Sequence, residues 1–122
     1  MTDDRRRCGA EGEAIAAAFL RARGYTILER NFRCRAGEID LIALAHDATV
    51  VFCEIRTRRS RHQGTALESV TPVKQHRVAH VAEHYVSRHR LHAHVIRFDV
   101  VAIEIAGSEV RIEHVPDAFG GT

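Results

Sequence analysis

Two acidic side chains stand at positions where a β-strand of a soluble protein normally carries apolar ones. Asp40 lies in GEIDLIAL, residues 37–44, and Glu54 lies in VVFCEIRTR, residues 50–58, and both segments have the composition of strands. Burying a carboxylate is costly unless a cation or a hydrogen bond compensates its charge. Two such acids on neighbouring strands therefore indicate a site rather than an ordinary core.

The spacing predicts that the two carboxylates converge. An antiparallel hairpin with a short turn centred on Asp47 places Asp40 opposite Glu54 on one face of the sheet. Two carboxylates this close repel each other unless a cation lies between them, and oxygen ligands suit a hard divalent ion such as Mg²⁺ or Mn²⁺. A site of this kind is typical of phosphoryl-transfer centres.

Three further charged residues are placed to join this site. Glu13 lies at the edge of an apolar helical face, Lys74 precedes the buried stripe of a second predicted helix, and Arg56 shares the strand face of Glu54. The alternative interpretation is that the two strand acids form a buried ion-pair network with Arg56 and Lys74, because structural networks of this kind are common.

The rest of the sequence predicts a scaffold in which helices and strands share one domain. The order of elements predicts a single α/β domain over residues 1–122, with a central mixed five-stranded sheet flanked by helices in three layers and with loosely held ends at about 1–8 and 116–122. The predicted elements are a helix over residues 9–23, a strand over 25–28 followed by a basic turn through Asn31 and Arg33, strands over 37–44 and 50–58, a polar loop over 59–70, a helix over 72–89 that begins after Thr71, and strands over 95–105 and 110–115.

Composition favours a soluble globular protein. The chain is 45% hydrophobic and 28% charged, and no apolar run is long enough to span a membrane. Met1 is followed by Thr2, Asp3 and Asp4 rather than by a signal sequence, so we expect a cytoplasmic location. The three cysteines form no C-x-x-C pair, which predicts neither a zinc site nor a disulfide framework.

Arginine dominates the basic residues. Of 18 basic side chains 17 are Arg, and the guanidinium group binds phosphate oxygens well, so clusters of Arg are candidate contacts to nucleic acid. The alternative is a solvated Arg-rich surface with no ligand. The candidate nucleic-acid-binding residues are Arg33, Arg35, Arg58, Arg59 and Arg61.

The paired acidic segments resemble the core of the PD-(D/E)XK nuclease superfamily. More closely, the chain resembles the bacterial YraN-like family of predicted endonucleases, which is similar to archaeal Holliday-junction resolvases. The resemblance covers nearly the whole chain and is carried by an ordered set of residues. Outside residues 37–58, the matching residues are Gly9, Gly12, Glu13, Gly24, Tyr25, Ile27, Leu28, Arg30, Asn31, Arg33, Gly64, Glu68, Val70, Lys74, Arg77, Arg97, Phe98, Asp99, Val100, His114, Ala118 and Phe119.

The resemblance implies a restriction-endonuclease-like fold and metal-assisted hydrolysis of DNA phosphodiesters. Asp40 and Glu54 would bind Mg²⁺ or Mn²⁺, together with the backbone carbonyl of Ile55. Glu13 would orient a metal-bound water, and Lys74 would lie near the phosphate. Similarity to resolvases further implies branched DNA as substrate and makes a homodimer a candidate assembly.

One departure from the superfamily pattern affects the expected chemistry. The third signature residue is normally Lys, whereas this chain has Arg56, and Arg does not lose its proton in proteins. Arg56 can still stabilise transition-state charge, so we retain it among the candidate catalytic residues. Two alternatives stay open: a catalytically impaired nuclease fold that only binds nucleic acid, and an interaction adaptor with an inert salt-bridged core.

Two other groups of residues carry less weight. His76, His80 and His84 recur at four-residue steps of the second helix, and a His pair at that spacing can bind a transition metal. No carboxylate or cysteine completes a known pattern, so we interpret these histidines as a solvated face. Asp99 alternates with apolar neighbours and is interpreted as a structural acid at a strand end.

Overall fold

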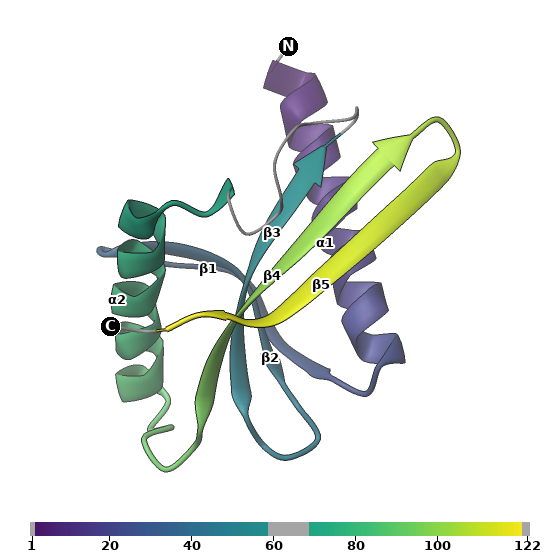
Figure 1. The fold of residues 1–122 in the computed structure, drawn as a ribbon. Coiled ribbons are helices and arrows are strands. Elements are labelled where there is room, and N and C mark those ends of the chain that lie inside the picture. Colours follow the sequence, from purple (N-terminus) through teal and green to yellow (C-terminus); the bar gives the residue numbers. More distant parts are fainter. Residues whose placement is uncertain (1, 59–68, 121–122) are drawn as a thin grey trace.

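The computed structural model describes the backbone of residues 2–58 and 69–120, and the side chains of 9–58 and 69–120. Within these ranges no helix is both long enough and apolar enough to cross a membrane. The elements, in chain order, are α1 (Thr2–Ala22), β1 (Thr26–Cys34), β2 (Gly37–Leu44), β3 (Val50–Arg58), α2 (Pro72–Arg88), β4 (Ile96–Ala106) and β5 (Glu109–Phe119) (Figure 1).

The five strands form one mixed sheet in the order β1-β2-β3-β4-β5. Every neighbouring pair is antiparallel except β3 and β4, which are parallel and are connected through α2. Parallel neighbours need such a crossover, because a tight turn cannot reverse the chain direction twice. The predicted α/β class and the mixed five-stranded sheet are confirmed.

The two helices cover opposite faces of this sheet (Figure 1). Alternation along β3 sends Val50 and Phe52 into the core beneath α2, and sends Val51 and Cys53 into the core beneath α1. Each face of β3 is thus buried, so its sequence reads as a nearly continuous apolar run. The predicted three-layer arrangement is confirmed.

The start of α2 follows its sequence signals closely. Thr71 is the N-cap, its hydroxyl accepts a hydrogen bond from the Lys74 N–H at 3.3 Å, and Pro72 occupies the first helical turn. This cap fixes where Lys74 emerges from the helix. The sequence-based start of the helix is therefore confirmed.

Three expectations about element ends are wrong. The first helix begins at Thr2 rather than at residue 9. The expected turn through Asn31 and Arg33 is instead part of β1, which pairs with β2 as far as Cys34 opposite Gly37. A locally left-handed Asn31, with φ of 55°, looks like a turn in sequence but only kinks the strand.

The third error concerns the end of the chain. Residues 116–119 are not loosely held, because β5 continues to Phe119, whose side chain is 8% exposed and stacks on Phe98 with ring centroids 5.2 Å apart. The Asp117 N–H also donates to the buried Asp99 carboxylate at 2.9 Å. Aromatic packing and this backbone hydrogen bond outweigh the disruption that Pro116 causes in the strand.

Candidate active site

Strands β2 and β3 pair as predicted and then separate at Asp40. Their antiparallel register runs from Leu44 opposite Val50 to Leu41 opposite Cys53, so Asp40 and Glu54 are the next residues on the two strands. At that point the Asp40 Oδ2 accepts a hydrogen bond from the Ile55 N–H at 2.8 Å. A side-chain carboxylate thereby takes the place of a backbone acceptor, and the two strands are free to part.

An open pocket of about 400 Å³ lies where the strands separate. Elements α1, β2, β3 and α2 all contribute to its lining. The lining residues are Gly9, Glu13, Glu38, Asp40, Ile55, Arg56, Thr57 and Lys74. The structure therefore brings together four of the five predicted catalytic residues around one cavity.

The fifth predicted residue, Glu54, lies behind this lining. Its side chain is 2% exposed, and its Oε1 is 3.6 Å from the Lys74 Nζ and 3.9 Å from the Arg56 Nη2. Both cations line the pocket, so the Glu54 carboxylate is separated from the cavity by the groups that neutralise it. Its location agrees with both interpretations made from the sequence, a metal ligand or a member of an ion-pair network.

The electrostatics of Glu54 show that its charge is only partly compensated. Burial, with a further contribution from the neighbouring Asp40 charge, raises the pKa of Glu54 to about 7 against the opposing effect of Lys74 and Arg56. At neutral pH the carboxyl group is thus held between its protonated and ionised forms. Additional positive charge in the pocket would favour the ionised form.

Asp40 shows the same imbalance. Burial raises the pKa of Asp40, and the charge of Glu13 contributes in the same direction, whereas the Ile55 N–H and the nearby cations lower it. Two carboxyl groups with raised pKa values, side by side, form a site that favours a hard cation with oxygen ligands. The chemistry of these donors fits Mg²⁺ or Mn²⁺ held by one or two carboxylates, with waters completing the shell.

Arg56 is folded back along its own strand. Its Nη1 donates to the carbonyl oxygen of Ile55 at 3.4 Å, and its Nη2 faces Glu54. The carbonyl that the family resemblance implies as a metal ligand therefore has a guanidinium beside it. Arg56 competes for this position with any cation that enters the pocket.

Glycine on α1 explains how Glu13 reaches the same pocket. A Cβ at Gly12 would overlap the Thr57 hydroxyl, so only glycine lets α1 approach β3 this closely. The Glu13 Oε1 accepts a hydrogen bond from the Asn31 Nδ2 at 3.0 Å. Asn31, which the sequence analysis placed in a turn and among the family-matching residues, is thus a partner of a pocket residue, a functional role that the sequence did not predict.

Of the predicted nucleic-acid contacts, the three that the structure describes do not line the pocket. Arg33 pairs with Glu38, itself a lining residue, with Nε and Oε2 3.0 Å apart. Arg35 is exposed near the β1–β2 turn, and Arg58 ends β3 half-buried. Arg59 and Arg61, like Gly64 and Glu68 of the family pattern, lie outside the described residues.

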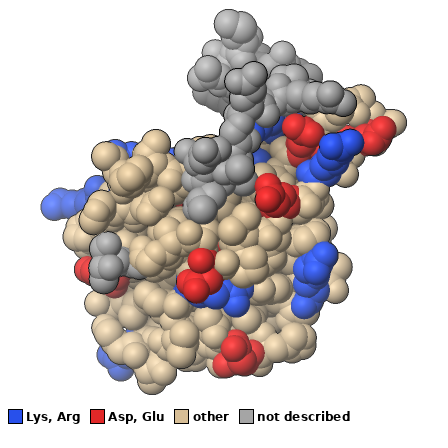
Figure 2. All heavy atoms as spheres, in the orientation of Figure 1, with Lys and Arg blue, Asp and Glu red and all other residues tan. Residues whose placement is uncertain are grey.

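The surface shows no continuous basic area on the one face drawn in Figure 2. Among the residues coloured there, each basic side chain (blue) is either isolated or lies next to an acidic one (red).

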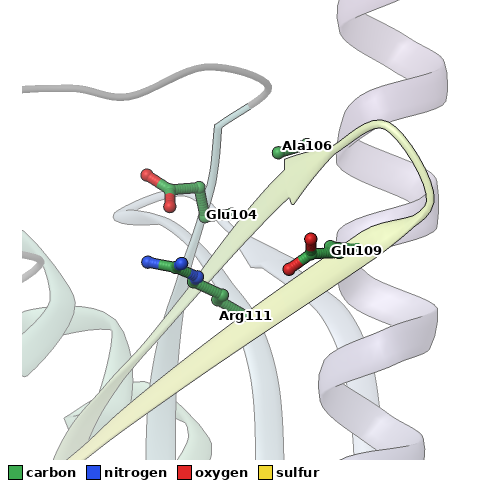
Figure 3. A pocket seen from close by; sticks show the side chains of 4 residues that line it. All are labelled: Glu104, Ala106, Glu109 and Arg111. Atoms are coloured by element: carbon green, nitrogen blue, oxygen red, sulfur yellow. The ribbon is translucent and has the colours of Figure 1, made fainter.

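A second pocket, of about 150 Å³, is lined by Glu104, Ala106, Glu109 and Arg111 at the β4–β5 hairpin (Figure 3). Arg111 lies opposite Glu104 across the two strands, so its charge is balanced by acids and the pocket offers no evident chemistry.

The helix histidines form no complete metal site in the part of the chain that the structure describes. The rings of His80 and His84 lie edge to face with centroids 5.1 Å apart, and both side chains are exposed. No group of three or more His, Cys, Asp or Glu side chains capable of holding a metal occurs among the described residues. The same holds at the Asp40 pocket, where water and substrate oxygens would have to supply the remaining ligands.

Asp99 is the centre of a separate, saturated hydrogen-bond cluster. Its fully buried carboxylate accepts from the Arg97 Nε and Nη2 at 2.9 and 2.8 Å and is 2.7 Å from the His114 Nε2. Burial alone would raise the pKa of Asp99, but the bonds from Arg97 and His114 outweigh it and lower the pKa. These contacts occupy the carboxylate and agree with the structural role expected for it.

Sequence comparison places the chain among proteins of one family. A sequence model described as "Uncharacterised protein family UPF0102" matches residues 12–103. A "UPF0102 protein" of Roseiflexus castenholzii is 47% identical over 121 residues, covering 97% of each chain. Another, from Pelobacter propionicus, is 46% identical over 118 residues, which cover 95% of this chain and 84% of that protein.

Structural comparison gives a more distant similarity. One match is to the crystal structure of a repair endonuclease from Pyrococcus abyssi, with a TM-score of 0.42 and 18% sequence identity. The aligned region covers 80% of this chain and 39% of that chain.

Proposed function

This chain belongs to the uncharacterised protein family UPF0102, and we propose that it is a Mg²⁺- or Mn²⁺-dependent endonuclease that hydrolyses DNA phosphodiester bonds. The observation that carries this proposal is the position of Asp40 and Glu54 on adjacent strands, with Asp40 lining the pocket, Glu54 buried behind it, and the pKa of each carboxyl group raised. In a fully compensated ion-pair network the cations would hold the pKa of each acid down, whereas here burial outweighs Lys74 and Arg56 and the pKa of both acids is raised.

The donors for the ion would be the carboxylates of Asp40 and Glu54 and the carbonyl of Ile55. When bound, a divalent ion lowers the pKa of a coordinated water and offsets the charge that develops on the phosphate. Arg56 would have to release the Ile55 carbonyl, from which it is 3.4 Å away, a distance typical of a weak hydrogen bond.

Glu13 and Lys74 would handle the proton and the phosphate. Glu13 lines the pocket from α1 and would accept a hydrogen bond from the attacking water. Lys74 is the nearer of the two cations that face Glu54, and unlike Arg56 it is able to give up a proton. We therefore assign proton transfer to Lys74 and fixed-charge stabilisation of the transition state to Arg56.

The substrate proposals depend on the surroundings of the pocket. Arg33, Arg35 and Arg58 would contact phosphates on either side of the scissile bond, and Arg59 and Arg61 would extend that contact. From the resemblance to resolvases we also propose that the protein prefers branched DNA and assembles as a homodimer.

A second function is supported by one specific observation. Arg56 lies against both the Ile55 carbonyl and Glu54, so its charge occupies the space that a metal ion would use. A protein in which this contact persists would bind nucleic acid without cutting it. The two functions make opposite predictions about the acidic residues, since removing negative charge near phosphate strengthens simple binding.

The experiment that tests the proposal is a cleavage assay on labelled single-stranded, duplex, flap and four-way DNA, with Mn²⁺, with Mg²⁺ and with chelator. A nuclease cuts at least one substrate only with metal, and Asp40→Asn abolishes cutting while the exposed-acid control Glu109→Gln does not. Binding of DNA without cutting, strengthened by Asp40→Asn, would establish the second function instead. A protein that neither binds nor cuts DNA would contradict both proposed functions and would leave the interaction adaptor as the remaining interpretation.

A further inference from the structure

Asn31 adopts a backbone conformation that no neighbouring strand residue shares. Its φ is 55°, in the left-handed region, although the pairs on either side of it, Arg30 with Leu41 and Phe32 with Ile39, keep the ordinary register of β1 and β2. Asparagine tolerates this region better than other non-glycine residues, but it still costs free energy there. Backbone strain of this kind clusters at functional sites, although it also occurs in turns, as at Ala48.

The register also places Asn31 next to the pocket acids. Between the flanking pairs, the residue of β2 that faces Asn31 is Asp40. The strand pairing is thus irregular on both sides of Asp40. On one side β1 is kinked at Asn31, and on the other side β3 no longer pairs with β2. A kink at this position turns the Asn31 side chain out of the regular alternation of the strand.

The side chain so displaced binds Glu13. The Asn31 Nδ2 donates to the Glu13 Oε1 at 3.0 Å, which joins β1 to α1 across 18 residues of sequence. A glutamate side chain on a helix surface has three rotatable bonds and loses much of its freedom when it is held. One amide N–H occupies Oε1 alone, so the same bond that fixes Glu13 leaves Oε2 for the pocket that Glu13 lines.

We propose that Asn31 is a positioning residue that holds the Glu13 carboxylate in its working orientation. This inference rests on the proposed function, because it assigns Glu13 the task of orienting the attacking water. The kinked backbone, the register opposite Asp40 and the amide bond to Glu13 each place the same residue at the same site. Partners of this kind orient the groups that act directly, and their loss typically costs 10–100-fold in metal affinity or activity.

The test uses Asn31→Gly, because glycine accepts the left-handed backbone while the side chain with its amide is removed. The matched control is Ala48→Gly, which makes the same backbone exchange at another left-handed residue, with φ of 69°, in the β2–β3 turn. We expect Asn31→Gly to lower kcat by about 10-fold or more with little change in KM, and Ala48→Gly to leave both unchanged. In a Glu13→Gln background, Asn31→Gly should cause no further loss.

Two outcomes would overturn the inference. One is an equal loss of activity from Asn31→Gly in the wild-type and Glu13→Gln backgrounds, which would show that Asn31 acts on the fold and not through Glu13. The other is an unchanged kcat in Asn31→Gly protein.

A measurement of Mn²⁺ affinity by calorimetry separates this inference from the proposed function. If the wild-type protein binds Mn²⁺ without cutting DNA, the nuclease proposal fails, and weaker Mn²⁺ binding by Asn31→Gly protein but not by Ala48→Gly protein would still support the positioning role. In such a non-cutting protein, equal Mn²⁺ affinity in all three proteins would overturn it, because Glu13 would then hold no metal-bound water in a way that depends on Asn31. A wild-type protein that neither cuts nor binds Mn²⁺ would contradict both proposals.

Discussion

Asp40 accepts a hydrogen bond from the backbone N–H of Ile55 at 2.8 Å, at the point where β2 and β3 stop pairing. The bond gives the pocket its shape, because a carboxylate replaces the next rung of the ladder and the strands part beyond it. It also leaves Asp40 beside Glu54, whose pKa is raised first by burial and then by the Asp40 charge. Asp40 therefore both opens the cavity and contributes to its electrostatics.

Metal-free protein should lose stability as the pH rises through neutrality. The folded-state pKa of Glu54, about 7, lies above its ordinary value of 4.5, so between these values the folded state binds more protons than the unfolded state. The contribution is complete below about pH 4.5 and is lost as the pH passes 7. Urea unfolding at pH 5 and pH 8 in chelator should show the difference, on the order of 1–3 kcal/mol.

Glu54→Gln is the matched variant for this pH dependence. A neutral amide removes the buried charge, so the fall in unfolding free energy between pH 5 and pH 8 should become smaller than in the wild-type protein. Asp40 contributes a residual dependence of the same sign, because its pKa is also raised. A wild-type protein equally stable at both pH values would show that the charge of Glu54 is already compensated.

Lys74 and Arg56 should differ in what a conservative exchange does to cleavage. Lys74→Arg keeps the positive charge beside Glu54 but removes the proton that can be transferred, so we expect a loss of about 10²-fold or more in kcat. Arg56→Lys keeps a charge and adds such a proton, so activity should be retained or increased. Full activity in Lys74→Arg protein would show that the pocket needs only fixed charge.

DNA binding should depend on Arg35 through charge alone. Truncation by Arg35→Ala should weaken binding on every DNA tested and should lower the slope of log K against log salt by about 1, as expected for one phosphate contact. Arg90→Ala, in the loop after α2, is the control. Identical salt slopes for these variants and the wild-type protein would remove the β1–β2 hairpin from the DNA interface.

The Asp99 cluster should matter for stability and not for metal binding. Asp99→Ala removes the acceptor for Arg97, His114 and the Asp117 N–H together, and it leaves a partly buried guanidinium without its partner. We expect about 3 kcal/mol of destabilisation by urea unfolding, with Mn²⁺ affinity unchanged for the folded protein. A variant as stable as the wild-type protein would show that the cluster is dispensable.

The sequence was sufficient to predict the elements that hold the acids. The apolar runs interrupted at Asp40 and Glu54 predicted strands β2 and β3 and their register. Thr71 predicted the start of α2. Both predictions succeeded because these signals are local. It could not reveal the bond between Asn31 and Glu13 or the contact between Gly12 and Thr57. Both depend on how α1 lies on the sheet, and periodicity does not encode that placement.

The backward fold of Arg56 was also beyond prediction from sequence. Strand alternation placed its side chain on the face of Glu54, but the choice between the pocket and the Ile55 carbonyl depends on packing and charge around it. The same sequence reasoning mistook the kink at Asn31 for a turn, because an Asn with positive φ is more common in turns than within strands.

The most direct test of the central claim is a crystal structure of the protein soaked with Mn²⁺, with the ion located by its anomalous scattering. We predict an ion in the pocket of β2 and β3, about 2.2 Å from an oxygen of Asp40 and from one of Glu54, with Arg56 displaced from the Ile55 carbonyl. An anomalous map without a peak between these two carboxylates, at Mn²⁺ concentrations that support binding in solution, would contradict the claim.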